Sequence, residues 1–119
     1  MTHIGVDIES IQRVQKLLDN KPQILKKFYF ESEWNYSMLK ASPAQTLTGI
    51  WCAKEAVIKA MSYYHTLKIQ DIEIEREKSG MPIVILHNLQ SIQCFHFSLS
   101  ISHCKEYAVA NVLVNFINI

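Results

Sequence analysis

The chain has 119 residues, which is enough for one compact domain with a single hydrophobic core. Hydrophobic residues make up 49% of it, and 12 Lys and Arg stand against 11 Asp and Glu, so the composition argues against a disordered chain and against a basic, duplex-binding protein. We expect neither a nucleic-acid nor a membrane partner, and the lack of a signal peptide and of paired cysteines predicts a cytoplasmic protein.

The first half of the chain is predicted to be one strand followed by helices. HIGVDI, residues 3–8, is a short apolar strand. Ser10 and Ser42 stand where the side chain of a helix N-cap is expected, and Pro43 suits a first helical turn. The apolar spacing then predicts helices over residues 10–20, 22–28, 32–40 and 43 to about 64.

The second half is predicted to form strands. IQDIEIER, residues 69–76, alternates apolar and charged residues and is expected to pair, through a turn at Ser79-Gly80, with residues 82–86. Residues 94–102 alternate aromatic or aliphatic side chains with serines, and residues 106–116 are expected to form a strand that is buried on both sides. This order predicts one α+β domain, residues 1–119, in which a mainly antiparallel sheet packs against a long central helix and shorter N-terminal helices.

GVDIE, residues 5–9, carries two acids that are two positions apart in a predicted strand. Side chains two apart point the same way, so Asp7 and Glu9 are expected on one side together. Carboxylate oxygens suit Mg²⁺, which keeps several waters as well. The alternative is structural: Asp7 caps the following helix and Glu9 is solvated.

WCAKEAVIKA, residues 51–60, stacks Glu55 and Lys59 one turn apart on a helix with much apolar surface. The pair could be an ordinary surface ion pair. Trp51 lies one turn before Glu55, however, so this stripe of the helix is partly apolar. Glu55 could therefore join Asp7 around a metal ion and leave Lys59 to meet a phosphate.

SISHCKEYAVA, residues 100–110, places His103 at the junction of two predicted strands, where a side chain can project from a rigid scaffold. Lys105 beside it favours an anion site, although a histidine in a turn is more often simply solvated. A zinc site is a further alternative, but the candidate ligands lack the paired spacing of structural sites: Cys94, His96, His103 and Cys104.

These three stretches, taken in this order, resemble the motifs of the 4′-phosphopantetheinyl transferases, and the length is similar to that of the small holo-[acyl-carrier-protein] synthases. The resemblance implies Mg²⁺-dependent transfer of the phosphopantetheine arm of coenzyme A to a serine of an apo acyl carrier protein, with release of 3′,5′-ADP. It also implies a homotrimer that binds coenzyme A in clefts between subunits.

The resemblance implies a role for each matching residue. Asp7, Glu55 and Lys59 would be the catalytic residues, with both acids as metal ligands and Lys59 at the pyrophosphate. Glu9 is the second acid of a D-x-E pair typical of the larger members, and we expect it to be the third metal ligand. Either Glu55 or a water on the metal could accept the proton of the attacking serine.

The resemblance also implies substrate contacts for two further sets of residues. Ser102 and His103 would hold phosphates of coenzyme A. Arg13 and Lys16 share one helix face, where basic side chains would steer an acidic carrier protein, although solvated basic residues are the ordinary alternative.

The sequence departs from the small members of the family at two places. Ile50 stands where those members usually carry an arginine that binds phosphate, and residues 62–70, SYYHTLKIQ, replace a glycine-rich loop. Both changes remove groups that bind anions. The alternative is therefore a non-catalytic homologue that binds a carrier domain or coenzyme A, and a plain structural or metal-binding module is a third reading.

Overall fold

The computed structural model describes residues 1–89 and 94–117. In chain order, its elements are β1 (Thr2–Ser10), α1 (Ile11–Asn20), α2 (Pro22–Lys26), α3 (Glu31–Met38), α4 (Pro43–Met61), the 3₁₀ turn η1 (Ile69–Asp71), β2 (Ile72–Arg76), β3 (Pro82–Leu86), β4 (Cys94–His103) and β5 (Tyr107–Ile117). Strands β1, β5 and β4 form an antiparallel sheet in that order, and β2 and β3 form a separate hairpin. The predicted α+β fold is confirmed.

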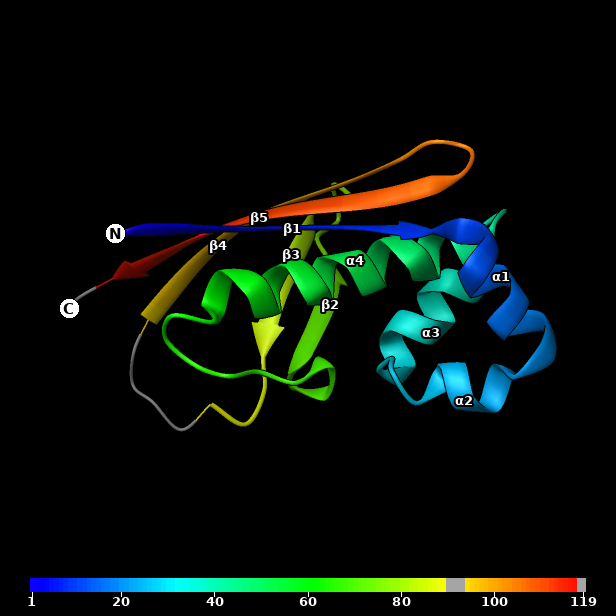
Figure 1. Cartoon of the computed structure of the whole chain (residues 1–119), viewed down its shortest axis with the longest axis horizontal. Helices are drawn as coiled ribbons and strands as arrows, with labels where there is room; N and C mark the ends of the chain where they lie inside the picture. Colours follow the sequence, from blue (N-terminus) through cyan, green and yellow to red (C-terminus); the bar gives the residue numbers. More distant parts are fainter. Residues whose placement is uncertain (90–93, 118–119) are drawn as a thin grey trace.

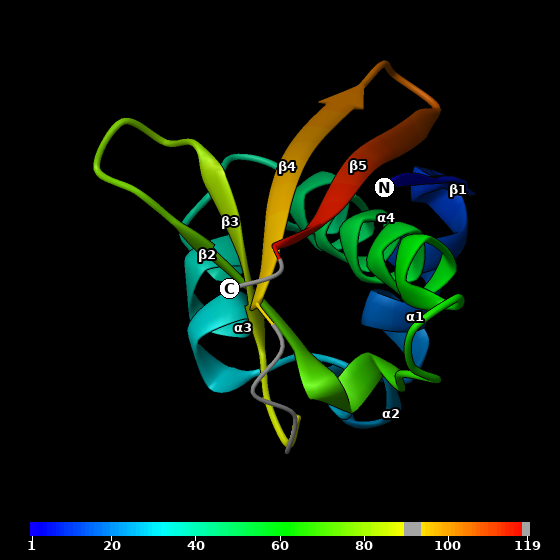
Figure 2. The same ribbon diagram turned by 90° about the vertical axis from the view of Figure 1, so that its left-hand side faces the viewer.

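Helix α4 packs along one face of the three-stranded sheet, as Figure 1 shows. The three shorter helices gather at the end of the molecule where β1 finishes, and the two chain termini lie at the other end. Figure 2 shows the β2–β3 hairpin beside β4, on the side of the sheet away from β1. No helix in the described part of the chain is long and apolar enough to cross a lipid bilayer.

Strand β5 is buried on one side only, so the prediction of burial on both sides is wrong. Ala108 and Val112 are fully buried against α4, whereas Leu113 between the buried positions is 43% exposed. The physical reason is that α4 covers one face of an antiparallel sheet and leaves the other face open. Strand β4 shows the predicted alternation, with Leu99 half-buried and Ser98 and Ser100 exposed.

Two predicted boundaries shift by about three residues, and one predicted helix cap is absent. Residues 69–71 form a 3₁₀ turn, and the strand expected from residue 69 begins at Ile72. Helix α4 ends at Met61, short of the predicted end near residue 64. Ser10 caps α1 through a hydrogen bond from the Arg13 amide, but Ser42, although it is the N-cap residue of α4, makes no side-chain capping hydrogen bond.

Gly5 sets the distance between β1 and α4. A Cβ atom at this position would overlap the backbone of Ala56 and Ala60, because the strand and the helix touch there without an intervening side chain. A glycine in a strand often marks such a close backbone approach. The contact brings the next inward-facing residue of β1, Asp7, against the second half of α4.

Candidate active site

The first part of the site joins β1 to α4. The Lys59 ammonium donates hydrogen bonds to the Asp7 carboxylate at 3.1 Å and to the Val6 carbonyl oxygen at 2.9 Å. Asp7 is half-buried and Lys59 is exposed. The predicted neighbours Asp7 and Lys59 therefore lie together, and Lys59 neutralises the aspartate.

Glu55 shares this electrostatic environment. Its pKa is raised above the ordinary value, first by burial and then by the negative charge of Asp7, while Lys59 opposes the shift. The same negative charges act on Cys52, which is fully buried one turn earlier on α4. Burial and then the Asp7 carboxylate raise the pKa of its thiol to about 12. Two half-buried carboxylates, one of which raises the pKa of the other in this way, favour a cation near them.

Glu9 lies on the same face of β1 as Asp7, as predicted, because Val6 and Ile8 alternate with them and are exposed. Its carboxylate accepts hydrogen bonds from the Ser10 amide at 3.2 Å and from the Arg13 guanidinium at 3.3 Å. It also contributes to the raised pKa of Glu55. Its role as a third metal ligand stays a prediction.

The donor set of the site fits Mg²⁺. Asp7 and Glu55 supply hard oxygen atoms, and Mg²⁺ is commonly held by one or two carboxylates together with waters and substrate phosphates. In residues 1–89 and 94–117, no group of three or more His, Cys, Asp and Glu side chains is arranged to hold a metal ion, and this includes the predicted set Asp7, Glu9 and Glu55. The same finding covers the candidate zinc ligands, of which Cys94, His96 and His103 lie on β4 and Cys104 follows it.

His103 lies near the N-terminal end of α4, far along the helix from Lys59 near its C-terminal end. Its side chain is on the same face of the sheet as those of Asp7 and Glu9. It belongs to the opposite edge strand, however, since β5 separates β4 from β1. The Gln45 amide nitrogen of α4 donates a hydrogen bond to the His103 Nδ1 at 2.7 Å, which leaves the proton of a neutral ring on Nε2. One protomer therefore does not bring His103 to Lys59.

Ser102 does not share the surroundings of His103. Neighbouring residues of a strand point to opposite faces, so Ser102 is exposed on the outer face of the sheet with Ser98 and Ser100. The predicted coenzyme A contact of Ser102 would have to be made from that face, and it stays a prediction.

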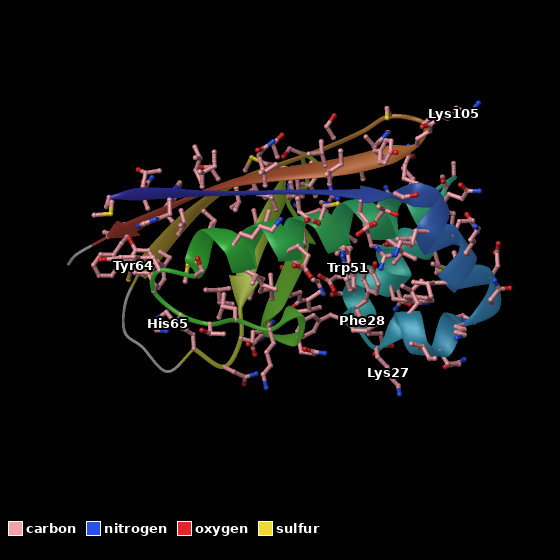
Figure 3. All side chains as sticks on the ribbon, viewed as in Figure 1. Lys27, Phe28, Trp51, Tyr64, His65 and Lys105 are labelled. Carbon is pink, nitrogen blue, oxygen red and sulfur yellow. The ribbon has the colours of Figure 1, made fainter. Side chains whose placement is uncertain are left out.

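The predicted docking residues Arg13 and Lys16 are both exposed on α1. A mostly apolar cavity of about 230 Å³ lies beside Arg13 and is lined by side chains of α1 and by Phe28 and Trp51. Those two rings meet edge to face, with centroids 5.2 Å apart, and Figure 3 shows them side by side between α4 and the short helices.

The sequence analysis missed a buried ion pair next to this site. Lys54 and Glu33 are almost fully buried, with the Lys54 ammonium 2.6 Å from the Glu33 carboxylate and 2.9 Å from the Phe28 carbonyl oxygen. Glu33 in turn accepts the amides of Phe30 and Ile74, each at 2.7 Å. The only signal in the sequence is a lysine within an otherwise apolar stretch of helix.

Comparison with known proteins identifies the family. The family model described as the 4′-phosphopantetheinyl transferase superfamily matches residues 3–112. The chain belongs to this superfamily. A holo-[acyl-carrier-protein] synthase of Clostridium botulinum (strain Alaska E43 / Type E3) is 34% identical over 119 residues, which cover 96% of this chain and 97% of that protein.

Solved structures of holo-[acyl-carrier-protein] synthases share the fold of this phosphopantetheinyl transferase. The Chronobacterium ammoniagenes ACPS–CoA complex aligns with a TM-score of 0.84 at 25% identity and covers 99% of both chains. The synthase from Bacillus anthracis str. Ames, in complex with CoA (3′,5′-ADP), is 34% identical, with a TM-score of 0.71 and 94% of each chain covered.

Proposed function

We propose that this chain transfers the 4′-phosphopantetheine arm of coenzyme A to a serine hydroxyl of an apo acyl carrier protein, with Mg²⁺ as cofactor, to give the holo carrier and 3′,5′-ADP. Family membership and the names of the relatives support this reaction. The observation that carries the proposal is the meeting of Asp7, Glu55 and Lys59 at the contact between β1 and α4.

In this reaction the serine oxygen forms a bond to the phosphorus that bears the pantetheine arm, and the bond from that phosphorus to the bridging oxygen breaks. The electron pair of that bond leaves on 3′,5′-ADP. Negative charge spreads over the phosphate oxygens, so catalysis depends on positioning and on cations. Asp7 and Glu55 would hold Mg²⁺, which supplies charge neutralisation at the pyrophosphate when bound. Lys59 would add its ammonium to the same phosphates.

Coenzyme A would bind between two copies of the chain. Lys59 lies near the C-terminal end of α4, whereas His103 contacts Gln45 near the N-terminal end, so a ligand that contacts both a lysine and a histidine of this kind is best placed between one copy's β1 edge and another copy's β4 edge. The outer face of β1 supports self-association, because its apolar side chains Ile4, Val6 and Ile8 are 66%, 50% and 62% exposed. We propose a homotrimer on this ground and on the resemblance. Sedimentation equilibrium should give three times the chain mass, and Ile8→Lys should lower it.

Mass spectrometry of an apo carrier protein tests the reaction. Incubation with coenzyme A, Mg²⁺ and the protein should increase the carrier mass by that of the phosphopantetheine arm, and a Glu55→Gln variant should not do so within the same time. A wild-type protein that binds coenzyme A or the carrier but never changes the carrier mass would establish the non-catalytic alternative instead.

A further inference from the structure

Two cations hold two of the three acids of the candidate site. The Lys59 ammonium binds the Asp7 carboxylate at 3.1 Å. Arg13, in the first turn of α1, binds the Glu9 carboxylate at 3.3 Å. Glu55 forms no ion pair among residues 1–89 and 94–117. Three acids are thus held by only two cations, and this excess of negative charge favours a further cation.

The Glu9 carboxylate is held at α1 rather than at the other two acids. Its Oε1 atom accepts hydrogen bonds from the Arg13 guanidinium at 3.3 Å and from the Ser10 amide at 3.2 Å. Within the described ranges, the three acids do not form a group arranged to hold a metal ion. Burial and then the negative charges of all three acids nevertheless raise the pKa of the Cys52 thiol. Glu9 is therefore near enough to the other acids to act on the same thiol, while its carboxylate stays bound to Arg13.

The Arg13–Glu9 ion pair is exposed enough to exchange partners. The Arg13 side chain is 73% exposed and the Glu9 side chain 22%. Exposed ion pairs of this kind stabilise a protein only slightly. The guanidinium carries five N–H donors, and two of them can bind one carboxylate side by side. An incoming carboxylate that binds in this way displaces Glu9, because the present contact of 3.3 Å is longer than a usual charge-assisted hydrogen bond.

The exposed side of α1 fits an acidic protein partner. Lys16 follows Arg13 by three positions and is exposed as well, so the two cations share a face of the helix. Lys16 forms no ion pair among the residues that the structure describes. Cations on one exposed face attract a partner with carboxylates on its surface. Under the proposed function, that partner is the acyl carrier protein.

We propose that Arg13 passes from Glu9 to an acidic side chain of the carrier protein when the carrier docks on α1, and that the released Glu9 becomes the third carboxylate of the Mg²⁺ site. The inference rests on the proposed function. Glu9 lies on the same face of β1 as Asp7, so the exchange needs rotation of one side chain and no change in the strand. Arg13 is thus a positioning residue for Glu9. Because each ligand favours the same state, carrier docking and Mg²⁺ binding strengthen each other by the same factor.

The affinity for a carrier protein, measured with and without Mg²⁺, tests this coupling. The probe is a dye-labelled apo carrier with alanine in place of its modified serine, and fluorescence anisotropy follows its binding at equal ionic strength without coenzyme A. Saturating Mg²⁺ should lower the Kd of the wild-type protein for the carrier by about tenfold. Arg13→Gln and Glu9→Gln should each show the same Kd with and without Mg²⁺. Any Mg²⁺ bound by the carrier itself is common to all variants, so the difference between variants isolates the coupling.

Lys16→Gln is the matched control, because Lys16 is the other exposed cation on this face of α1 and does not pair with Glu9. It should weaken carrier binding as Arg13→Gln does, but keep the full effect of Mg²⁺. If Arg13→Gln also keeps that effect, Arg13 serves docking alone and the inference is overturned.

The wild-type protein separates this inference from the proposed function. Equal carrier affinity with and without Mg²⁺, in a protein that transfers the phosphopantetheine arm, would overturn the coupling and leave the proposed function standing. A wild-type protein that neither binds a carrier nor changes its mass would overturn the proposed function, and this inference with it.

Discussion

Lys59 on α4 and Asp7 on β1 form an ion pair with a nitrogen–oxygen distance of 3.1 Å, although 52 residues separate them in the sequence. The Lys59 side chain is 54% exposed and the Asp7 side chain only 16%, so the ammonium lies between the carboxylate and the solvent. A metal ion held by Asp7 and Glu55 would compete with Lys59 for the aspartate. Lys59 would then be released toward phosphate, which gives one side chain two partners in succession.

Replacement of Lys59 by methionine tests this competition. Lys59→Met should leave Mg²⁺ binding in the absence of coenzyme A unchanged or tighter, because Asp7 loses a competing cation. It should lower kcat/KM for coenzyme A by about 10- to 100-fold, since a charged contact to the transferred phosphate is lost. Metal titration and steady-state kinetics measure the two effects. Lys27→Met, at an exposed lysine that Figure 3 shows pointing away from α4, is the control and should alter neither quantity. Weaker Mg²⁺ binding in Lys59→Met would contradict the idea.

The role of Glu9 can be tested apart from those of Asp7 and Glu55 through the Mg²⁺ dependence of turnover in a Glu9 variant. If Glu9 is the third ligand, Glu9→Gln should raise the Mg²⁺ concentration for half-maximal turnover several-fold, because a neutral amide is a weaker ligand than a carboxylate. Glu31→Gln, at an exposed acid in the first turn of α3, is the control. If Glu9→Gln leaves the Mg²⁺ dependence as it was, Glu9 serves only to hold Arg13 and the Ser10 amide.

Local patterns could predict much of the fold. The alternation in β4 and the serine cap of α1 depend on neighbouring residues, and the structure confirms both. Burial of β5 on one side only could not be read from its sequence, because Leu113 is apolar and yet exposed. Which face of a strand is covered depends on where α4 packs, and this is a tertiary property.

The candidate site was predictable to different degrees. The three motifs pointed to Asp7, Glu55 and Lys59 through the resemblance, whereas no local pattern says that β1 and α4 touch at Gly5. A cavity of about 400 Å³ at the start of α4 is lined by Tyr36, Lys40, Arg76 and His103, and of these the sequence pointed only to His103, since the side chains come from separate elements and become neighbours only in the folded chain.

The docking face on α1 is better tested at Lys16 than at Arg13. Arg13→Glu would place a carboxylate beside Glu9, which now accepts a hydrogen bond from Arg13 at 3.3 Å, and so would disturb the acids of the site as well. Lys16→Glu should raise the KM for an acidic carrier by about three- to tenfold at low salt and less at high salt, because screening weakens steering. The KM for coenzyme A should not change. Lys78→Glu, on the tip of the β2–β3 hairpin, makes the same charge change away from α1 and should spare both values. Equal changes in both KM values for Lys16→Glu would count against a docking role.

The Glu73 carboxylate should make stability depend on pH. Hydrogen bonds from the Ser32 hydroxyl at 2.6 Å and from the His87 ring at 2.8 Å hold its pKa below the ordinary value of 4.5. A lowered folded-state pKa stabilises the protein above the unfolded-state pKa, and this contribution is lost as the pH falls through the folded-state pKa. Glu73→Gln should therefore be less stable than wild type at pH 6 in urea unfolding, and the difference should shrink below pH 4.5. The control Glu75→Gln, at the exposed neighbour on β2, should show no such dependence.

Lys54 is expected to be needed for stability, in contrast to its neighbour Glu55. Burial lowers the pKa of Lys54 and raises that of Glu33, so each group is costly alone, and their contact at 2.6 Å offsets the cost. Lys54→Met would leave the Glu33 carboxylate buried without its cation and should cost about 3–5 kcal/mol of unfolding free energy. Urea unfolding measures this loss.

A second variant separates the missing charge from the altered packing. In Lys54→Met/Glu33→Gln the unpaired charge is gone, while the oxygen of the new side-chain amide can still accept one of the two backbone amides that Glu33 holds, so much of the lost stability should return. Glu55→Gln is the control, because it alters the next residue of α4 without touching the pair, and it should abolish transfer without a comparable loss of stability. If Lys54→Met is as stable as wild type, the buried pair does not hold α3 and β2 against α4.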